Sequence, residues 1–179
     1  MNYVVYQGRQ ELSGERQLKE MRTYDLLDEL NIEYLRVDHE ALETMEACQE
    51  VDKLLGAAMC KNLFLCNAQK TKFYLLLMPG DKKFKTKDLS KQIGSARLSF
   101  GPSEDMGRLL DITPGSVSVM GLMNDKNKEV SLIIDKDLLE EEYFSCHPCI
   151  NTSSIRLRTE DLLDKFLPKV GHKAVVVSL

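Results

Sequence analysis

Residues 61–79 read KNLFLCNAQKTKFYLLLMP. Two extended apolar runs, 62–66 and 72–78, are separated by a short polar link. That pattern predicts a β-hairpin whose second strand is ended by Pro79-Gly80. Because the link is far too short for the crossover that parallel strands need, the two strands are expected to pair antiparallel.

Two helices and a strand are expected before this hairpin. Apolar residues recur every three or four positions over 14–30, which predicts a helix with Ser13 as its cap. Residues 33–37 predict a strand. Thr44 is expected to cap a second helix over 45–55, which ends at the glycine that follows it.

The chain after the hairpin alternates helices and strands. Strands are predicted at 117–122, 130–134, 155–157 and 174–177, and helices at 87–93, after a Ser103 cap, and from a Thr159 cap to residue 166. The turn-like residues 124–127 favour a second hairpin between the first two of these strands. Short links between neighbouring strands place the chain in the α+β class, with a mixed, mainly antiparallel sheet.

Length and composition favour one globular unit. The 179 residues suit a single domain spanning 1–179, and 43% hydrophobic with 29% charged residues exclude wholesale disorder. The apolar run 73–78 is far too short to cross a bilayer, which takes about 20 residues. The first residues, MNYVVYQGRQ, lack the features of a secretory signal, so a cytoplasmic protein without membrane contact is expected.

The cysteine content bears on metal and redox chemistry. Five cysteines at irregular spacing argue against a disulfide framework and favour reduced thiols. Cys146-His147-Pro148-Cys149 contains one CxxC around a histidine, which suits either a redox pair or half of a zinc site. A structural zinc needs four ligands, and the other thiols stand far apart in the chain. No metal and no cofactor are therefore expected.

Charge is distributed unevenly along the chain. The net charge is −4, but residues 61–97 hold nine basic and two acidic residues, a local charge of +7 that leaves −11 for the remainder. Such a basic segment can bind a polyanion, while the acidic remainder limits indiscriminate binding of nucleic acid. The alternative is a lysine-rich face that is simply solvated.

Common catalytic motifs are missing, because the sequence has no P-loop, G-x-G-x-x-G, H-E-x-x-H or G-x-S-x-G. Lys61 opens an apolar strand, where its charge can enter a pocket or merely reach water. Residues 114–118 form a turn at Gly115 whose amides suit an oxyanion hole, although a plain loop fits as well. His39 and His147 occupy loop positions, where histidines are often only surface residues.

Four blocks of residues carry a family resemblance through their order and spacing. They are Asp38-His39, Lys61-Asn62-Leu63-Phe64-Leu65, Pro114-Gly115-Ser116-Val117-Ser118 with Gly121-Leu122, and His147-Pro148 followed by Asn151-Thr152. Over about residues 15–178 the chain resembles the YbaK/prolyl-tRNA editing domain family, and within it the free-standing ProXp-ala or PrdX-like deacylases. The resemblance implies a mixed β-sheet, partly closed like a barrel and flanked by helices. It also implies hydrolysis of the ester that joins a wrong amino acid to tRNA for proline, with alanine the substrate of this branch and cysteine that of the YbaK branch.

The resemblance also implies roles for single residues. Lys61 matches the family's essential lysine, the Gly115 turn matches its G-x-x-x-P loop, and His147 matches its pocket histidine, which makes these three the catalytic candidates. The family's loop ends in proline where this chain has Val119, so the loop is expected to be less rigid. The expected substrate-binding residues are His39, Asn62, Ser116, Val117, Ser118, Asn151 and Thr152.

The expected partners follow from the same resemblance. They are tRNA for proline mischarged with a small amino acid, and prolyl-tRNA synthetase. Lys82, Lys83 and Lys85 are the expected tRNA-binding residues, since they lie in the basic segment. The alternatives are a module that binds tRNA or aminoacyl-tRNA without hydrolysing it, a deacylase for cysteine on tRNA for proline, and a lysine-rich interaction module unrelated to tRNA. Convergence of Lys61, Gly115 and His147 in one cleft would favour the enzyme.

Overall fold

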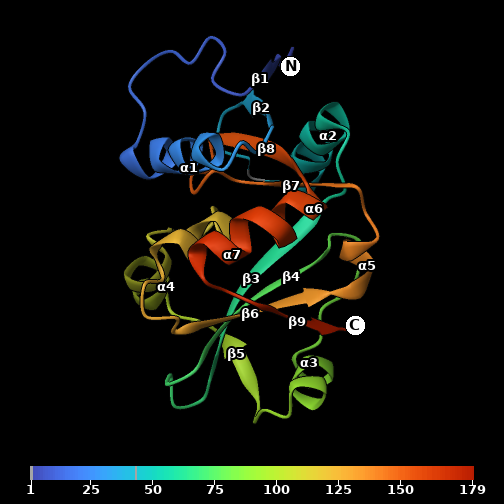
Figure 1. Ribbon diagram of the computed structural model, residues 1–179. Helices are drawn as coiled ribbons and strands as arrows, with labels where there is room; N and C mark the ends of the chain where they lie inside the picture. Colours follow the sequence, from blue (N-terminus) through green and yellow to red (C-terminus); the bar gives the residue numbers. More distant parts are fainter. Residues whose placement is uncertain (1, 43) are drawn as a thin grey trace.

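The computed structural model describes residues 2–42 and 44–179 and contains two β-sheets with helices packed on them (Figure 1). The four-stranded sheet is antiparallel throughout, in the order β1 (Val5–Gln7), β2 (Leu35–Asp38), β8 (Ser153–Arg158) and β7 (Tyr143–Cys146). The five-stranded sheet is mixed, in the order β5 (Leu98–Phe100), β3 (Cys60–Asn67), β4 (Phe73–Pro79), β6 (Val130–Asp135) and β9 (Ala174–Val177). The α+β class with mixed and antiparallel strands is therefore confirmed.

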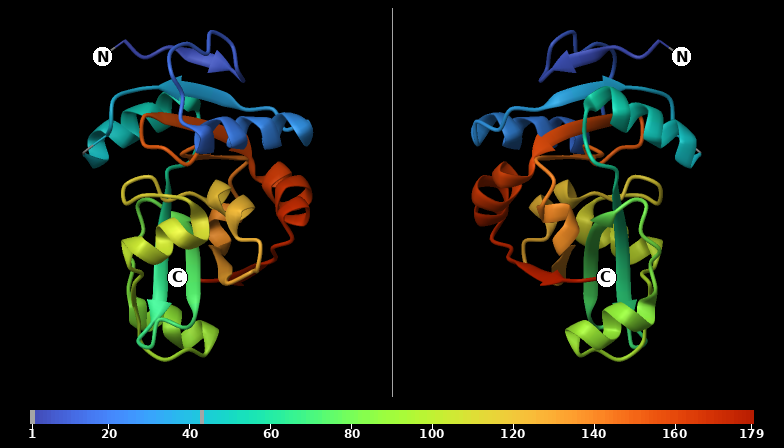
Figure 2. Two further views of the ribbon diagram at one scale, coloured as in Figure 1. Left: turned by 90° about the vertical axis from the view of Figure 1, so that its left-hand side faces the viewer. Right: turned by 90° about the vertical axis from the view of Figure 1, so that its right-hand side faces the viewer.

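Helices cover the sheets and separate them. In Figure 1, α1 and α2 lie with the four-stranded sheet at the top, while α3 lies at the far end of the molecule beside β5. The views in Figure 2 show the helical segments that follow β8 lying at the level between the sheets. The bounds are α1 Leu18–Glu29, α2 Met45–Leu55, α3 Thr86–Ile93, α4 Ser103–Leu110, the 3₁₀ helix η1 Val119–Asn124, α5 Lys136–Leu139, α6 Thr159–Asp161, the π-helical turn η2 Leu162–Phe166 and α7 Leu167–Val170.

The hairpin of β3 and β4 is confirmed, with Lys61 opposite Met78 and Phe64 opposite Leu75. Successive side chains of a strand point to opposite faces of its sheet. Phe64 accordingly packs in the main core, whereas the next residue, Leu65, packs in a second core with α3 residue Leu89. The run 73–78 is apolar throughout because β4 is covered on both faces.

The predicted strand 117–122 and its hairpin with 130–134 are wrong. Residues 119–124 form η1 instead, and β6 pairs parallel with both β4 and β9. Val119, Met120 and Leu122 are fully buried, and a short buried apolar run looks alike in a strand and in a helical turn. Ser118 caps η1 by accepting a hydrogen bond from the Met120 amide at 3.1 Å. The long crossovers that parallel pairs need are supplied by the chain between β4 and β6 and between β6 and β9.

Three predicted helix caps are also wrong, whereas Thr44 is confirmed as a cap. Helix α1 begins at Leu18 after Gln17, α4 follows Pro102, and α6 follows Arg158, so Ser13, Ser103 and Thr159 are not N-caps. The Thr159 hydroxyl donates to the carbonyl of Glu141 instead. The sequence interpretation missed the short elements β1, β5, β7 and α5, which have too few residues to show a period.

A single parallel bridge between Ala58 and Phe144 links the two sheets. The Ala58 amide donates to Tyr143 O at 3.2 Å, and the Ser145 amide donates to Ala58 O at 3.3 Å. The family resemblance implied a sheet partly closed like a barrel. Over residues 2–42 and 44–179 the strand pairings form two sheets and show no barrel closure. Where the structure describes the chain, no helix has the length and apolar character that spanning a membrane requires.

Candidate active site

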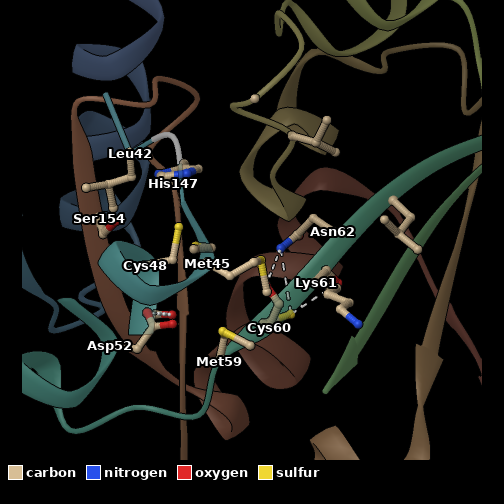
Figure 3. Close-up of a pocket in the computed structure, with 15 residues that line it drawn as sticks. Leu42, Met45, Cys48, Asp52, Met59, Cys60, Lys61, Asn62, His147 and Ser154 are labelled. Carbon is tan, nitrogen blue, oxygen red and sulfur yellow. Dashed lines mark hydrogen bonds between the residues drawn. The ribbon is translucent and has the colours of Figure 1, made fainter. Parts of the chain in front are cut away.

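A cavity of about 270 Å³ lies at the start of β3, just after the Ala58 bridge that links the two sheets (Figure 3). Helix α2 forms one wall, the start of β3 a second, and the turn at Gly115 a third. The end of β7 and the start of β8 complete it. The lining residues are Leu42, Met45, Cys48, Asp52, Met59, Cys60, Lys61, Asn62, Leu63, Gly115, Val117, Ser145, Cys146, His147 and Ser154.

Local sequence signals position α2 as a wall. The Thr44 hydroxyl accepts a hydrogen bond from the Ala47 amide at 3.2 Å, and Gly56 ends the helix in the left-handed conformation at φ 65°. Residues four apart lie on one face of a helix, so Cys48 and Asp52 point together into the cavity. The helix therefore carries a carboxylate into a space whose other lining residues, apart from Lys61, are apolar, thiol or neutral polar.

The start of β3 brings two side chains to opposite faces of the strand. Figure 3 shows the Asn62 amide directed toward Cys60 and the Lys61 ammonium turned away from it. The Asn62 amide nitrogen donates to Cys60 O at 3.5 Å, and its Oδ1 is buried with no hydrogen-bond partner within the described residues. The Lys61 ammonium donates to the carbonyl of Lys82. Lys61 thus borders the cavity with its charge held at the rim.

The turn at Gly115 offers backbone donors beside the cavity. Gly115 has φ +88°, which a residue with a side chain rarely adopts, and a Cβ there would lie 3.8 Å from Asn151 Nδ2. The Ser116 amide donates to Thr113 O at 3.1 Å. The amides of Gly115 and Val117 have no acceptor within residues 2–42 and 44–179, and both residues line the cavity. These two amides, rather than that of Ser116, fit an oxyanion hole.

His147 lies at the cavity with a defined pattern of hydrogen bonds. Its Nδ1 is 2.8 Å from Ser153 O, so Nδ1 carries the proton and Nε2 is left as an acceptor. Burial lowers the pKa of His147, which keeps the ring neutral at pH 7. His39 does not line the cavity. Its Nε2 lies 2.9 Å from the hydroxyl of Ser154, which does, so His39 sits behind the wall.

The remaining substrate-binding candidates lie beside the cavity rather than in its lining. Ser116 and Ser118 are buried in the loop, where Ser116 donates to Thr113 O at 2.9 Å and Ser118 caps η1. Asn151 stands next to Gly115. Thr152 is exposed, and its carbonyl accepts from the His39 amide at 3.0 Å. Local sequence order indicated these loops but not which of their side chains line the cavity.

The three candidate tRNA-binding lysines differ in their surroundings. The Lys82 ammonium pairs with Asp135 at 2.9 Å and Asp137 at 2.6 Å, and donates to Leu179 O at 2.9 Å. Asp135 is fully buried, so Lys82 neutralises a carboxylate of the fold and is not free to bind phosphate. Lys83 and Lys85 are exposed.

Helix α2 is the part of the site that the sequence interpretation missed. Asp52 is 9% exposed, its carboxylate accepts a hydrogen bond from the Ser145 hydroxyl, and burial raises its pKa to about 6. One signal could have identified this helix. Asp52 is an acidic residue on the buried face of an amphipathic helix, next to Val51 and near Leu55.

The thiols around the cavity are protonated. Burial raises the pKa of Cys60 to about 12 and also raises that of Cys146 above its ordinary value. A buried thiol of this kind is a poor nucleophile. In the described part of the chain, no three His, Cys, Asp or Glu side chains gather as a metal site would need.

Comparison with known proteins assigns the family. The family described as "Aminoacyl-tRNA editing domain" matches residues 39–165. The "Prolyl-tRNA editing protein ProX" of Acetoanaerobium sticklandii is 35% identical over 86% of this chain and 93% of its own. The "Prolyl-tRNA synthetase associated domain-containing protein 1" of Danio rerio is 26% identical over 86% of this chain and 84% of its own.

A solved structure agrees at the level of the fold. A crystal structure of a candidate trans-editing enzyme for prolyl tRNA synthetase superposes with a TM-score of 0.66 at 16% identity, over 92% of this chain and 99% of the other. The sequence matches and the fold lead to one assignment. The chain belongs to the aminoacyl-tRNA editing domain family, the YbaK-like deacylases, and is a hydrolase.

Proposed function

We propose that this protein hydrolyses the ester of tRNA for proline mischarged with a small amino acid, and that alanine is the amino acid it removes. The observation that carries the proposal is the meeting of Lys61, Gly115 and His147 at one cavity. A relative with 35% identity is named as a prolyl-tRNA editing protein, which supports the choice of tRNA. Residues 1–179 would form one editing domain.

The lining residues suit hydrolysis of an ester that is already activated. Such a reaction needs a positioned water and donors for the oxygen that becomes negative, more than a strong nucleophile. The amides of Gly115 and Val117 would bind the carbonyl oxygen as its charge develops. The neutral Nε2 of His147 would accept a hydrogen bond from the substrate or the attacking water.

Lys61 would act at the rim of the cavity. Its ammonium is held by one backbone carbonyl, so rotation of a flexible side chain can exchange that contact for a phosphate of the terminal adenosine or for the ester. The buried, unpaired Oδ1 of Asn62 would accept a hydrogen bond from a ribose hydroxyl or from the aminoacyl group.

Selection by size would come from the apolar side chains of the wall. Leu42, Met45, Met59 and Val117 narrow the cavity. One methylene in such a pocket changes affinity by only about 1–3 kcal/mol, so a synthetase that admits a smaller amino acid benefits from a second site that excludes the correct one. The cavity would therefore accept alanine and exclude proline.

The partners are part of the same proposal. Mischarged tRNA for proline is the substrate, and prolyl-tRNA synthetase is the enzyme whose errors the protein would correct. The exposed lysines Lys83 and Lys85 would contact the tRNA backbone. A cytoplasmic location is also proposed, since five free thiols suit a reducing compartment.

The test is a deacylation assay with tRNA for proline charged in separate reactions with alanine, cysteine, serine or proline. We expect the alanyl ester to be lost fastest and the prolyl ester to be spared. Faster loss of the cysteinyl ester would replace alanine with cysteine as the substrate. Binding of all four without ester loss would overturn the enzymatic proposal in favour of a binding module.

A further inference from the structure

Asp52 is a charged group of the cavity to which the proposed reaction assigns no task. It lies on α2, and its carboxylate borders the space into which Cys48, Cys60 and Cys146 also point. The charge of Asp52 adds to burial in raising the pKa of each of these thiols, so the carboxylate lies close to all three. Its own pKa of about 6 leaves it ionised at pH 7.

No cation of the protein neutralises this carboxylate. Over residues 2–42 and 44–179, the Asp52 side chain has one polar partner, the Ser145 hydroxyl, and no ion pair. Lys61 borders the same cavity, but its ammonium is turned toward the carbonyl of Lys82. A buried carboxylate without a counter-ion is costly and is expected to gain from a cationic ligand.

Resting on the proposed function, we infer that Asp52 binds the α-ammonium group of the aminoacyl ester and thereby orients the ester toward the amides of the Gly115 turn. An amino acid with a small apolar side chain carries its one positive charge on that group. The site is suited to it, because the remaining lining is apolar, thiol or neutral polar apart from Lys61 at the rim. Asp52 is then a specificity residue for amino acids over hydroxy acids on tRNA.

A purely structural role makes a different prediction. The Asp52 and Ser145 side chains join α2 to β7, and asparagine in place of Asp52 keeps an oxygen that accepts from the same hydroxyl. Asp52→Asn therefore removes the charge and retains the hydrogen bond with Ser145. If the only role of Asp52 were to accept this hydrogen bond, the variant would bind substrate as the wild type does.

The experiment measures binding of tRNA for proline whose terminal adenosine carries alanine or lactate through a stable amide at the 3′ position. Lactate replaces the ammonium with a hydroxyl at almost the same volume. We expect the wild type to bind the alanyl form at least about 10-fold tighter than the lactyl form, as a close charge pair provides. In Asp52→Asn the two dissociation constants should agree within about threefold.

Two variants control for the hydrogen bond between Asp52 and Ser145 and for long-range charge. Ser145→Ala removes the hydrogen bond and should retain the preference for the alanyl form. Glu46→Gln removes an exposed charge from the same helix and should also retain it. Equal wild-type affinity for both forms would overturn the inference, as would an Asp52→Asn protein that keeps the preference or a Glu46→Gln protein that loses it.

The binding measurement separates this inference from the proposed function. A wild type that hydrolyses no charged tRNA but prefers the alanyl analogue through Asp52 would refute the proposed reaction and support ammonium recognition. A wild type that hydrolyses alanyl-tRNA but does not distinguish alanyl from lactyl analogues would support the proposed reaction and refute ammonium recognition by Asp52.

Discussion

The rings of His39 and His147 lie with their centroids 6.2 Å apart and are tilted by 57° to each other. His147 borders the cavity, and His39 stands behind it and meets the Ser154 hydroxyl at 2.9 Å. Burial lowers the pKa of both rings. Two neutral histidines can lie this close because neither carries a charge that would repel the other, so the part of the cavity wall that His147 forms stays neutral at pH 7.

Replacing His147 should change which amino acid is removed. We expect His147→Ala to stay folded and to alter the ratio of the rates on alanyl- and cysteinyl-tRNA for proline, because the ring forms part of the wall. His172 is the control, since it pairs with buried Asp125 at 2.9 Å and is absent from the lining of the cavity. His172→Ala should lower the melting temperature and leave that ratio unchanged. Wild-type rates of His147→Ala on both substrates would remove His147 from the site.

Replacing Lys61 should abolish most deacylation. Lys61→Ala loses one hydrogen bond to a backbone carbonyl, worth about 1 kcal/mol of stability, and the protein should stay folded. The rate should fall by at least about 100-fold, the effect of removing one charge-stabilising donor from a site. Single-turnover deacylation measures it, with Lys126→Ala, an exposed lysine outside the lining, as the control. Unchanged activity of Lys61→Ala would refute its assignment.

Replacing Lys83 and Lys85 should weaken the binding of tRNAs of any nucleotide sequence. Each lysine on a phosphate contributes about 1 to the slope of log affinity against log salt, so the double alanine variant should flatten that slope by up to about 2. Lys70 and Lys72 are the control pair, because they lie at the opposite end of the β3–β4 hairpin, roughly 20 Å away at about 3.3 Å per residue. A flatter slope in the control pair alone would place the tRNA at that end.

Lys82 should behave differently from its two neighbours. Lys82→Ala leaves the buried Asp135 carboxylate without its cation, so we expect a lower melting temperature. The salt slope of tRNA binding should stay as in the wild type, since the ammonium is already engaged. Thermal unfolding and binding titrations on the same preparation measure both. A flattened slope with an unchanged melting temperature would return Lys82 to the tRNA-binding surface.

Val119→Pro should be tolerated. Val119 is the first residue of η1, where a helix leaves the amide unbonded and proline is favoured. The preceding residue, Ser118, has φ −152° and ψ 146°, an extended conformation that suits a residue before proline. We expect a rate equal to or above that of the wild type in the deacylation assay. A large loss of rate in a folded variant would show that the Val119 amide itself contacts the substrate.

Asp52→Asn should stabilise the protein at neutral pH. Burial raises the pKa of Asp52 to about 6, against about 3.8 when unfolded, so the folded state binds this proton more tightly and loses stability as pH rises through that window. Asparagine removes this cost, worth about 1–3 kcal/mol at pH 7.5. Urea unfolding should show the gain at pH 7.5 and a smaller one at pH 5. A variant less stable than the wild type at pH 7.5 would contradict this.

The parts of the fold that rest on local signals could be predicted from the sequence. The apolar runs around residues 67–71 predicted the β3–β4 hairpin, and Thr44 with Gly56 predicted both ends of α2, because strand alternation, capping and the left-handed glycine each involve only neighbouring residues. The order of the four sequence blocks likewise led to the family, which the comparisons confirmed.

Contacts between residues far apart in the chain could be learned from the three-dimensional structure alone. Residues 117–122 had the composition of a strand, yet burial against Leu110 and Ile112 folds part of them into η1, where a Cβ at Gly121 would lie 2.5 Å from Ile112 Cδ1. The sequence predicted Lys82 as a free surface cation, but in the fold β6 places Asp135 next to it. Asp52 became part of the cavity because the bridge between Ala58 and Phe144 sets β7 beside α2. Such pairings depend on contacts between segments far apart in the chain, which local patterns do not encode.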